Sequence, residues 1–213
     1  MSRPRAARLF ALITAVGALL ATVLTVLAHL AAGPGMDARS LTISDYAVSE
    51  RGRPVAMAMF VLGAASLALP LGLRAAGVAV GRLPALLLLG WSSGLMAAAI
   101  IPTDPQGTPH LSLQGYVHRY VSVTAFICLP AAALLAVRRL AADPRWRGAL
   151  RAVRALAVTS VLGLAGLYYV AYPGDRVMMG LVQRILVATE VLLLGLLAMR
   201  LYRIAGLPGP RRR

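Results

Sequence analysis

Long apolar stretches separated by short polar segments dominate the chain. A transmembrane helix needs about 20 predominantly apolar residues, and six stretches meet this requirement. They cover residues 9–32, 54–76, 83–101, 115–137, 156–172 and 179–202. The stretches are unbroken and rich in Leu and Ala, whereas membrane strands alternate between polar and apolar positions. The pattern predicts an all-α polytopic membrane helix bundle of about six transmembrane helices, built from residues 1–213 as a single domain.

Glycine and proline mark the breaks between these stretches. Gly33-Pro34-Gly35 ends the first predicted helix, and Pro173-Gly174 separates the last two. Pro54 suits the first turn of the second helix, where its missing N–H costs nothing. Pro70 and Pro130 fall inside the second and fourth predicted helices. A proline there removes a backbone hydrogen bond, so we expect kinks at these two positions.

The N-terminal segment has some features of a signal peptide. Arg3, Arg5 and Arg8 precede the first apolar stretch, as basic residues do in a signal sequence. The stretch itself runs for 24 residues, from 9 to 32, and is longer than the apolar region of an ordinary signal peptide. We therefore expect a retained first transmembrane helix.

Composition supports a membrane protein and excludes other classes. Apolar residues make up 59% of the chain and charged residues 14%, against about 25% charged residues in soluble domains. The net charge of +15 does not indicate a nucleic-acid partner, because the basic residues form short clusters between apolar stretches. All 22 are Arg and none is Lys, which we interpret as the codon bias of a GC-rich bacterial genome. A single cysteine, Cys128, rules out an intramolecular disulfide and a Cys-based metal site.

The arginines predict how the bundle is oriented. With the N-terminus in the cytoplasm, 16 of the 22 arginines fall on the cytoplasmic side and 6 on the outer side. The positive-inside rule then places both termini in the cytoplasm, for a multi-pass protein of the cell (plasma) membrane. The lipid bilayer is the expected partner, and the arginine-rich inner face would attract anionic lipid. The sequence gives no indication of the oligomeric state.

Residues capable of chemistry gather on the predicted outer side. Candidate catalytic residues there are Asp45, Glu50, Asp104 and His118. Asp104, His110 and His118 could hold zinc or another divalent metal, but their spacing matches no standard zinc signature. A structural histidine hydrogen-bonded to Asp104 is the alternative that we favour. A haem between His29 and His118 is not expected, because an electron path across the membrane needs a second, inner pair of ligands.

Two charged residues of the sixth stretch are candidates for substrate binding. Arg184 lies near its outer end and could hold an anionic group, and Glu190 lies near its middle. A carboxylate at that depth costs about 2.5–3.5 kcal/mol, so we expect it to face the bundle interior. It either forms a proton or substrate site or makes an interhelical hydrogen bond. The two residues are about 9 Å apart along a helix axis and on different faces, so we expect no direct pair.

Four short motifs, in order along nearly the whole chain, resemble those of the DUF998 family of bacterial six-helix membrane proteins. They are Ser44-Asp45-Tyr46 with Ser49-Glu50, Thr103-Asp104-Pro105, Gly115-x-x-His118 and Gly180-Leu181-x-Gln183-Arg184. Ala47-Val48 and Arg51-Gly52 depart from the family pattern but keep both acids. The resemblance implies the six-helix architecture and no defined activity. It also implies that Asp45, Glu50, Asp104, His118 and Arg184 form one outer-facing cluster.

Three functions remain open from the sequence. The outer cluster could bind or hydrolyse a lipid head group or a small anion. The chain could instead be a non-enzymatic membrane component, such as an assembly partner or lipid organiser. A proton-coupled transporter using Glu190 ranks below both, because the chain lacks clear inverted repeats.

The predicted orientation can be tested directly. A reporter fused after Arg213 should be active only in the cytoplasm, because 16 of the 22 arginines hold both termini on that side. Activity of the same fusion outside the cell would reverse the bundle and place the candidate cluster on the cytoplasmic face.

Overall fold

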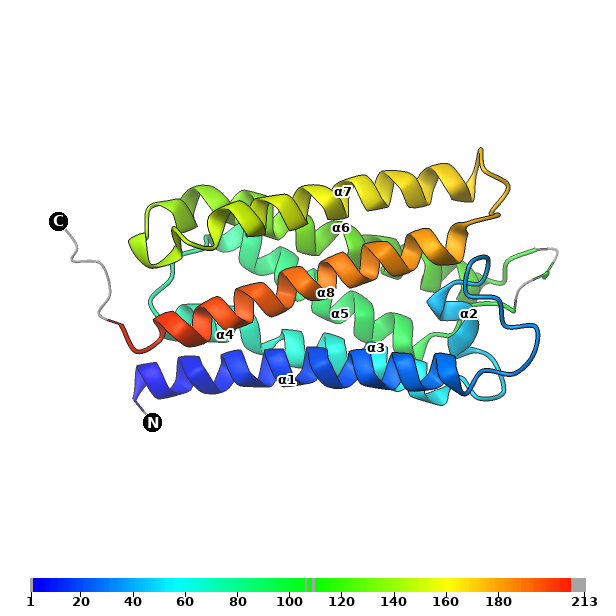
Figure 1. The fold of residues 1–213 in the computed structure, drawn as a ribbon, viewed down its shortest axis with the longest axis horizontal. Coiled ribbons are helices and arrows are strands. Elements are labelled where there is room, and N and C mark those ends of the chain that lie inside the picture. Colours follow the sequence, from blue (N-terminus) through cyan, green and yellow to red (C-terminus); the bar gives the residue numbers. More distant parts are fainter. Residues whose placement is uncertain (1, 106, 109, 208–213) are drawn as a thin grey trace.

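The computed structural model describes residues 2–105, 107–108 and 110–207, and these form a bundle of helices. Figure 1 shows its elements in order. They are α1 (Arg3–Leu30), α2 (Ile43–Ala47), α3 (Arg53–Ser66), α4 (Ala68–Ala75), α5 (Arg82–Ile100), α6 (Leu113–Ala141), the 3-10 helix η1 (Pro144–Trp146), α7 (Leu150–Ala171) and α8 (Met179–Ile204). No strand occurs within the described residues.

Six helical segments are long and apolar enough to cross a membrane, which confirms the predicted fold class. They are α1, the combined segment Arg53–Ala75, α5, α6, α7 and α8. Some helices begin before their apolar stretches, within the arginine-containing segments that precede them: α1 begins at Arg3, six residues before the predicted start, and α7 begins at Leu150. The extra turns carry arginine, so they add helix length without adding apolar length.

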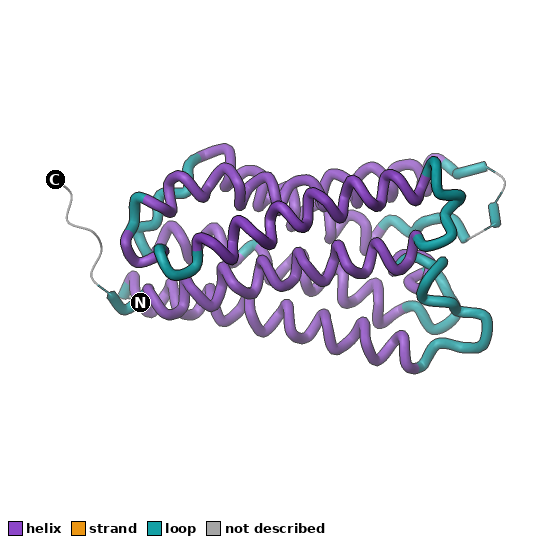
Figure 2. Tube along the Cα trace, turned by 45° about the horizontal axis from the view of Figure 1, so that its top comes forward, coloured by secondary structure: helices purple, strands orange, loops and turns teal. Residues whose placement is uncertain are grey.

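The spanning helices close into a ring. Going around the bundle, α1 packs on α3, α3 on α5, α5 on α6, α6 on α7, α7 on α8, and α8 returns to α1. Figure 2 shows the helices lying side by side along one axis, with the loops that connect them at the two ends. The start of α1 and the end of α8 lie at one end, which we call the terminal end; the opposite end carries α2 and is called the α2 end (Figure 1).

The second span is broken in its middle. The predicted effect of Pro70 appears three residues earlier, at Leu67, where α3 ends and α4 begins. Pro70 has no N–H for the carbonyl of Ser66, and its ring crowds that carbonyl. The Ser66 hydroxyl donates to the carbonyl of Leu62 at 2.6 Å and accepts from the indole N–H of Trp91 on α5 at 3.1 Å. Pro130, in contrast, lies within α6, which continues from Leu113 to Ala141.

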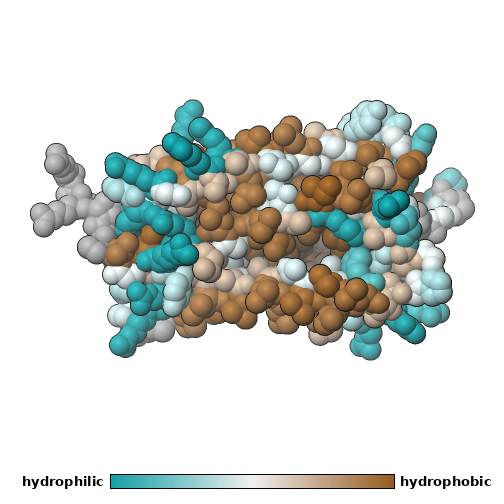
Figure 3. Space-filling model, viewed as in Figure 1, coloured by the Kyte–Doolittle hydropathy of each residue, from teal (hydrophilic) through white to brown (hydrophobic). Residues whose placement is uncertain are grey.

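The surface of the bundle has the hydropathy of a membrane protein. Figure 3 shows a broad apolar band between two polar ends. Large apolar side chains in the band are well exposed, for example Leu19 on α1 and Leu162 on α7, each at 65%. An apolar surface of this extent is typical of a protein embedded in a membrane. Together with the six spans, it supports a multi-pass membrane protein.

Glycines allow neighbouring helices to approach closely. A Cβ on Gly94 would lie 3.0 Å from the Cβ of Ala125, and one on Gly90 would lie 2.9 Å from the sulfur of Cys128. This glycine pair therefore brings α5 into close contact with α6. Gly17 makes the equivalent contact between α1 and α3, where an added Cβ would overlap the Cβ of Ala65.

Two glycine substitutions should have opposite effects on stability. Gly17→Ala should destabilise the fold by about 1–3 kcal/mol, because overpacking forces α1 and α3 apart. Gly195→Ala, on α8, should stabilise it by about 0.5–1 kcal/mol: nothing lies within 4 Å of its added Cβ, and alanine favours the helix. Thermal unfolding of both variants in one detergent checks this. Equal midpoints would contradict the close α1–α3 contact.

Candidate functional site

A cavity of about 590 Å³ lies inside the bundle, in the half nearer the α2 end. Its walls come from α1, α2, α3, α5, α6 and α8. Most of the lining is apolar, including Leu62, Leu95, Phe126 and Val191. Polar residues also line it; they are Thr22, Thr25, His29, Ser44, Ser122, Gln183 and Arg184. Cavities of about 300–1,000 Å³ with an apolar lining and a few polar groups are typical of ligand sites.

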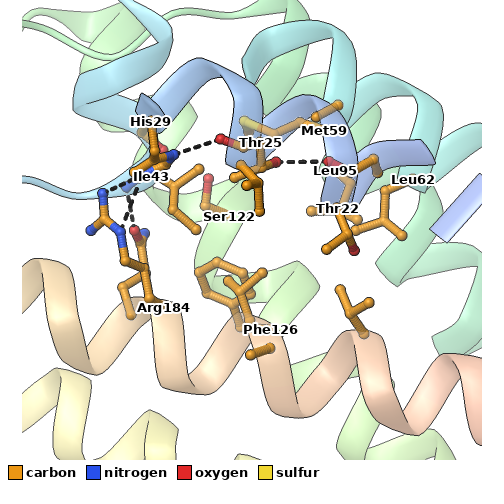
Figure 4. Close-up of a pocket in the computed structure, with 18 of the residues that line it drawn as sticks. Thr22, Thr25, His29, Ile43, Met59, Leu62, Leu95, Ser122, Phe126 and Arg184 are labelled. Carbon is orange, nitrogen blue, oxygen red and sulfur yellow. Dashed lines mark hydrogen bonds between the residues drawn. The ribbon is translucent and has the colours of Figure 1, made fainter. Parts of the chain in front are cut away.

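Arg184 dominates the polar end of the cavity. Its guanidinium extends from α8 toward α1 and the segment that precedes α2 (Figure 4). Nη1 donates to the carbonyls of Ala38 at 2.8 Å, Leu41 at 2.6 Å and Gly180 at 2.9 Å. Gly180 permits this approach, since a Cβ there would overlap the Leu41 carbonyl. The Arg184 side chain thus connects the loop after α1 to the start of α8.

His29 is the second partner of Arg184. Its Nδ1 lies 2.7 Å from the carbonyl of Thr25, so Nδ1 carries a proton and donates it. Nε2 then has a free lone pair, which accepts from Nη2 of Arg184 at 2.6 Å and from its Nε at 3.2 Å. The ring also stacks on Tyr46, with centroids 4.2 Å apart and planes 16° from parallel. These contacts fix a neutral imidazole between the guanidinium and α1.

No carboxylate forms an ion pair with Arg184 within the described part of the chain; Asp37 and Asp45 act on its charge only from a distance. The ion pair found there joins Arg145 to Asp143 near the terminal end. A guanidinium has five N–H donors. The two N–H groups on Nη1 donate to the three carbonyls. The N–H on Nε and one N–H on Nη2 point at His29, so one N–H on Nη2 remains. Arg184 therefore brings a net positive charge and a spare donor to the end of an apolar cavity.

The two aspartates predicted as catalytic candidates lie at helix starts. The Asp45 carboxylate accepts from the backbone N–H and the hydroxyl of Thr42, both at 2.7 Å, in a capping box at the start of α2. The Asp104 carboxylate accepts from the backbone N–H and the hydroxyl of Ser112, also at 2.7 Å. Ser112 in turn caps α6. Both carboxylates therefore satisfy the free N–H groups of helix N-termini.

His118 lies close to the cavity and joins three elements. Its Nδ1 is 2.6 Å from the carbonyl of Ile101, and its Nε2 is 3.0 Å from the hydroxyl of Ser44. A neutral ring that donates from Nδ1 and accepts at Nε2 satisfies both contacts. The hydrogen bond that we expected between a histidine and Asp104 is thus replaced by these two. The ring connects α6 to α2 through a residue that lines the cavity.

The structure brings only part of the predicted cluster together. Of its five members, Arg184 lines the cavity, and His118 bonds to Ser44, which lines it too. Glu50 and His110 are exposed. Among the described residues, no three histidine, cysteine or acidic side chains are placed to hold a metal ion. The metal site at Asp104, His110 and His118 therefore gains no support from the geometry, and both nitrogens of His29 and of His118 are already hydrogen-bonded.

Sequence reasoning missed the carbonyl partners of Arg184 and the role of Gln183. The Gln183 side chain is buried and its Oε1 accepts from the backbone N–H of Ile43 at 2.7 Å. It docks α2 against α8 and lines the cavity. The motif Gly180-Leu181-x-Gln183-Arg184 contained the signal, since three of its residues contact the same loop.

Glu190 is completely buried inside the bundle, as expected for an acid at that depth. Neither carboxyl oxygen has a hydrogen-bond partner in the structure. The residue precedes the cavity-lining Val191 on α8 but does not line the cavity itself. The interhelical hydrogen bond that we left open for it is therefore not formed, and Arg184 bonds elsewhere.

Comparison with known proteins gives one match. The model of the family described as "Protein of unknown function (DUF998)" matches residues 15–200. No curated protein and no solved structure matches the chain.

Replacing Glu190 should reveal the cost of its unbonded oxygens. Glu190→Leu should stabilise the protein by about 1–3 kcal/mol, because it removes a buried polar group that lacks a partner. Glu190→Gln keeps an unbonded polar group of the same size and should leave the thermal midpoint close to wild type. A large loss of stability in the leucine variant would show that the carboxyl has a partner after all.

Proposed function

We propose that this chain, which belongs to the DUF998 family of proteins of unknown function, binds an anionic amphiphile in its cavity. The acidic head group would lie at Arg184 and one acyl chain would fill the apolar part. The positive-inside rule favours the outer side of the membrane for the α2 end. The ligand would then come from the outer leaflet.

The observation that carries the proposal is the charge of Arg184, which forms no ion pair within the described residues. Water cannot fully solvate a guanidinium beside an apolar cavity, and carbonyl dipoles and a neutral imidazole cancel none of its net charge. The spare N–H on Nη2 gives an anion a direct hydrogen bond. A phosphate or carboxylate oxygen is the natural partner, because hydrogen bonds between ions are the strong ones.

The remaining lining fits an acyl chain. Beyond the polar end, the walls are formed by side chains such as Leu62, Leu95 and Phe126. The cavity residues of α8 run from Gln183 to Leu192, about 13 Å along the helix at 1.5 Å per residue. That length suits part of one acyl chain. A chain that comes from the leaflet is already in hydrocarbon, so its fit to the cavity rests on packing and the selectivity rests on Arg184.

Binding fits the geometry better than hydrolysis. Asp45 and Asp104 each accept two hydrogen bonds at a helix start. The Nε2 atom of His118 accepts from Ser44. A general base must reach the attacking group, and Asp45 and Asp104 would first have to give up bonds that hold α2 or α6. His118 reaches the Ser44 hydroxyl, but its other nitrogen is held by the carbonyl of Ile101 and not by a carboxylate. The chain would act as a lipid-binding membrane component, which joins two of the functions predicted from the sequence.

Native mass spectrometry of purified protein tests this proposal. Wild type supplied with equal amounts of phosphatidylglycerol and phosphatidylcholine should retain mainly phosphatidylglycerol. Arg184→Gln keeps an amide donor for the loop carbonyls but removes the charge, and should lower this retention at least tenfold. Inorganic phosphate should not displace the lipid, because it cannot fill the apolar part.

The matched control is Arg176→Gln, which removes an exposed arginine at the same end of the bundle. It should retain the lipid as wild type does. Equal retention of both lipids by wild type, or wild-type retention of phosphatidylglycerol by Arg184→Gln, would contradict the proposal. Thermal midpoints of both variants show whether they are folded.

A further inference from the structure

The wall of the cavity is thin between α1 and α8. These helices contact each other at the terminal end, where Arg8 lies over the ring of Tyr202 and an added Cβ on Gly206 would overlap Arg8. They diverge toward the α2 end (Figure 1). Figure 3 shows the surface hollowed between them in that half of the bundle.

The same side chains line the cavity and face the surroundings. Thr22, Val26 and Leu30 on α1 and Ala188 and Leu192 on α8 all line the cavity, and all five are exposed. Leu30 is 78% and Leu192 62% exposed. No second layer of side chains therefore separates the cavity from the outside along this seam, which we call the α1/α8 opening.

The opening faces the apolar band and not the polar end of the bundle (Figure 3). At the polar end, the start of α2 lines the cavity. This segment and the loop before it are bonded to α8, because Arg184 binds the carbonyls of Ala38 and Leu41 and Gln183 binds the N–H of Ile43. A ligand from water would meet these bonded segments. A lipid chain in the adjoining leaflet meets only apolar side chains and one threonine.

We infer that the cavity is filled sideways from the bilayer, through the α1/α8 opening, by an acyl chain of a leaflet lipid. The inference rests on the proposed function and adds the route and the part of the ligand that enters. The head group then stays at the membrane surface beside Arg184, while one chain passes between the two helices.

Tryptophan fluorescence can report the chain directly. The two tryptophans, Trp91 and Trp146, are both fully buried, and only Trp91 lines this cavity. Bromine on an acyl chain quenches a tryptophan at near-contact range. In vesicles of phosphatidylglycerol brominated along its chains, a Trp146→Phe protein should therefore be quenched at Trp91. A Trp91→Phe protein, which keeps the equally buried Trp146, should be quenched several-fold less.

Closing the opening provides the decisive test. Ala188→Phe, made in the Trp146→Phe protein, should reduce quenching of Trp91 at least threefold. Thr22→Phe fills the opening from α1 and should do the same if the first variant does not fold. Val161→Phe places the same ring on the exposed face of α7, away from the cavity, and should leave quenching unchanged.

The outcomes separate this inference from the proposed function. If Trp91 is quenched equally with the opening filled, the chain enters by another route and only the lateral entry is overturned. If phosphatidylglycerol is retained but Trp91 is never quenched, the head group binds without its chain entering, which also overturns it. Loss of selective retention in the wild type would overturn the proposed function itself.

Discussion

Closure of the helix ring at the α2 end depends on the hydrogen bonds of Arg184. The guanidinium connects α8 to the loop after α1 through two carbonyls and to α1 itself through His29. Beside an apolar cavity water can replace such bonds only in part, so these polar groups depend on partners within the protein. One cation thus holds the first and last helices at the level where they diverge, and the cavity exists because they are held without packing tightly.

The polar residues of the loops also provide hydrogen-bond partners for polar groups of the protein. Asp45 and Asp104 satisfy helix N-termini, and His118 satisfies the carbonyl of Ile101 at the end of α5. These groups looked like a reaction centre in sequence because acids, histidine and serine lie close together there. Their geometry shows that they hold the short α2 and the start of α6 in place. What remains available for a ligand is the charge of Arg184 and the apolar space beside it.

The fold was predictable because apolar length is a strong and local signal. All six spans were located from it, and the break near Pro70 followed from the missing N–H. The capping box from Thr42 to Asp45 could also have been recognised, since Thr-x-x-Asp is a known cap pattern. The partners of Arg184 could not, because Ala38 and Leu41 contribute carbonyls that every residue has. A cavity likewise depends on how helices diverge, which no pattern of residue types records.

The bond between Trp91 and Ser66 has a consequence for how the bundle adapts to bilayers of different thickness. The indole N–H is fully buried and finds its acceptor at the single point where α3 ends. Sliding α5 by one turn along α3 would leave that N–H unbonded in an apolar interior, at a cost of about 1–3 kcal/mol. Hydrophobic mismatch usually costs only fractions of a kcal/mol per Å. The bundle should therefore respond to thinner or thicker membranes by tilting as one body, with the register of its helices preserved.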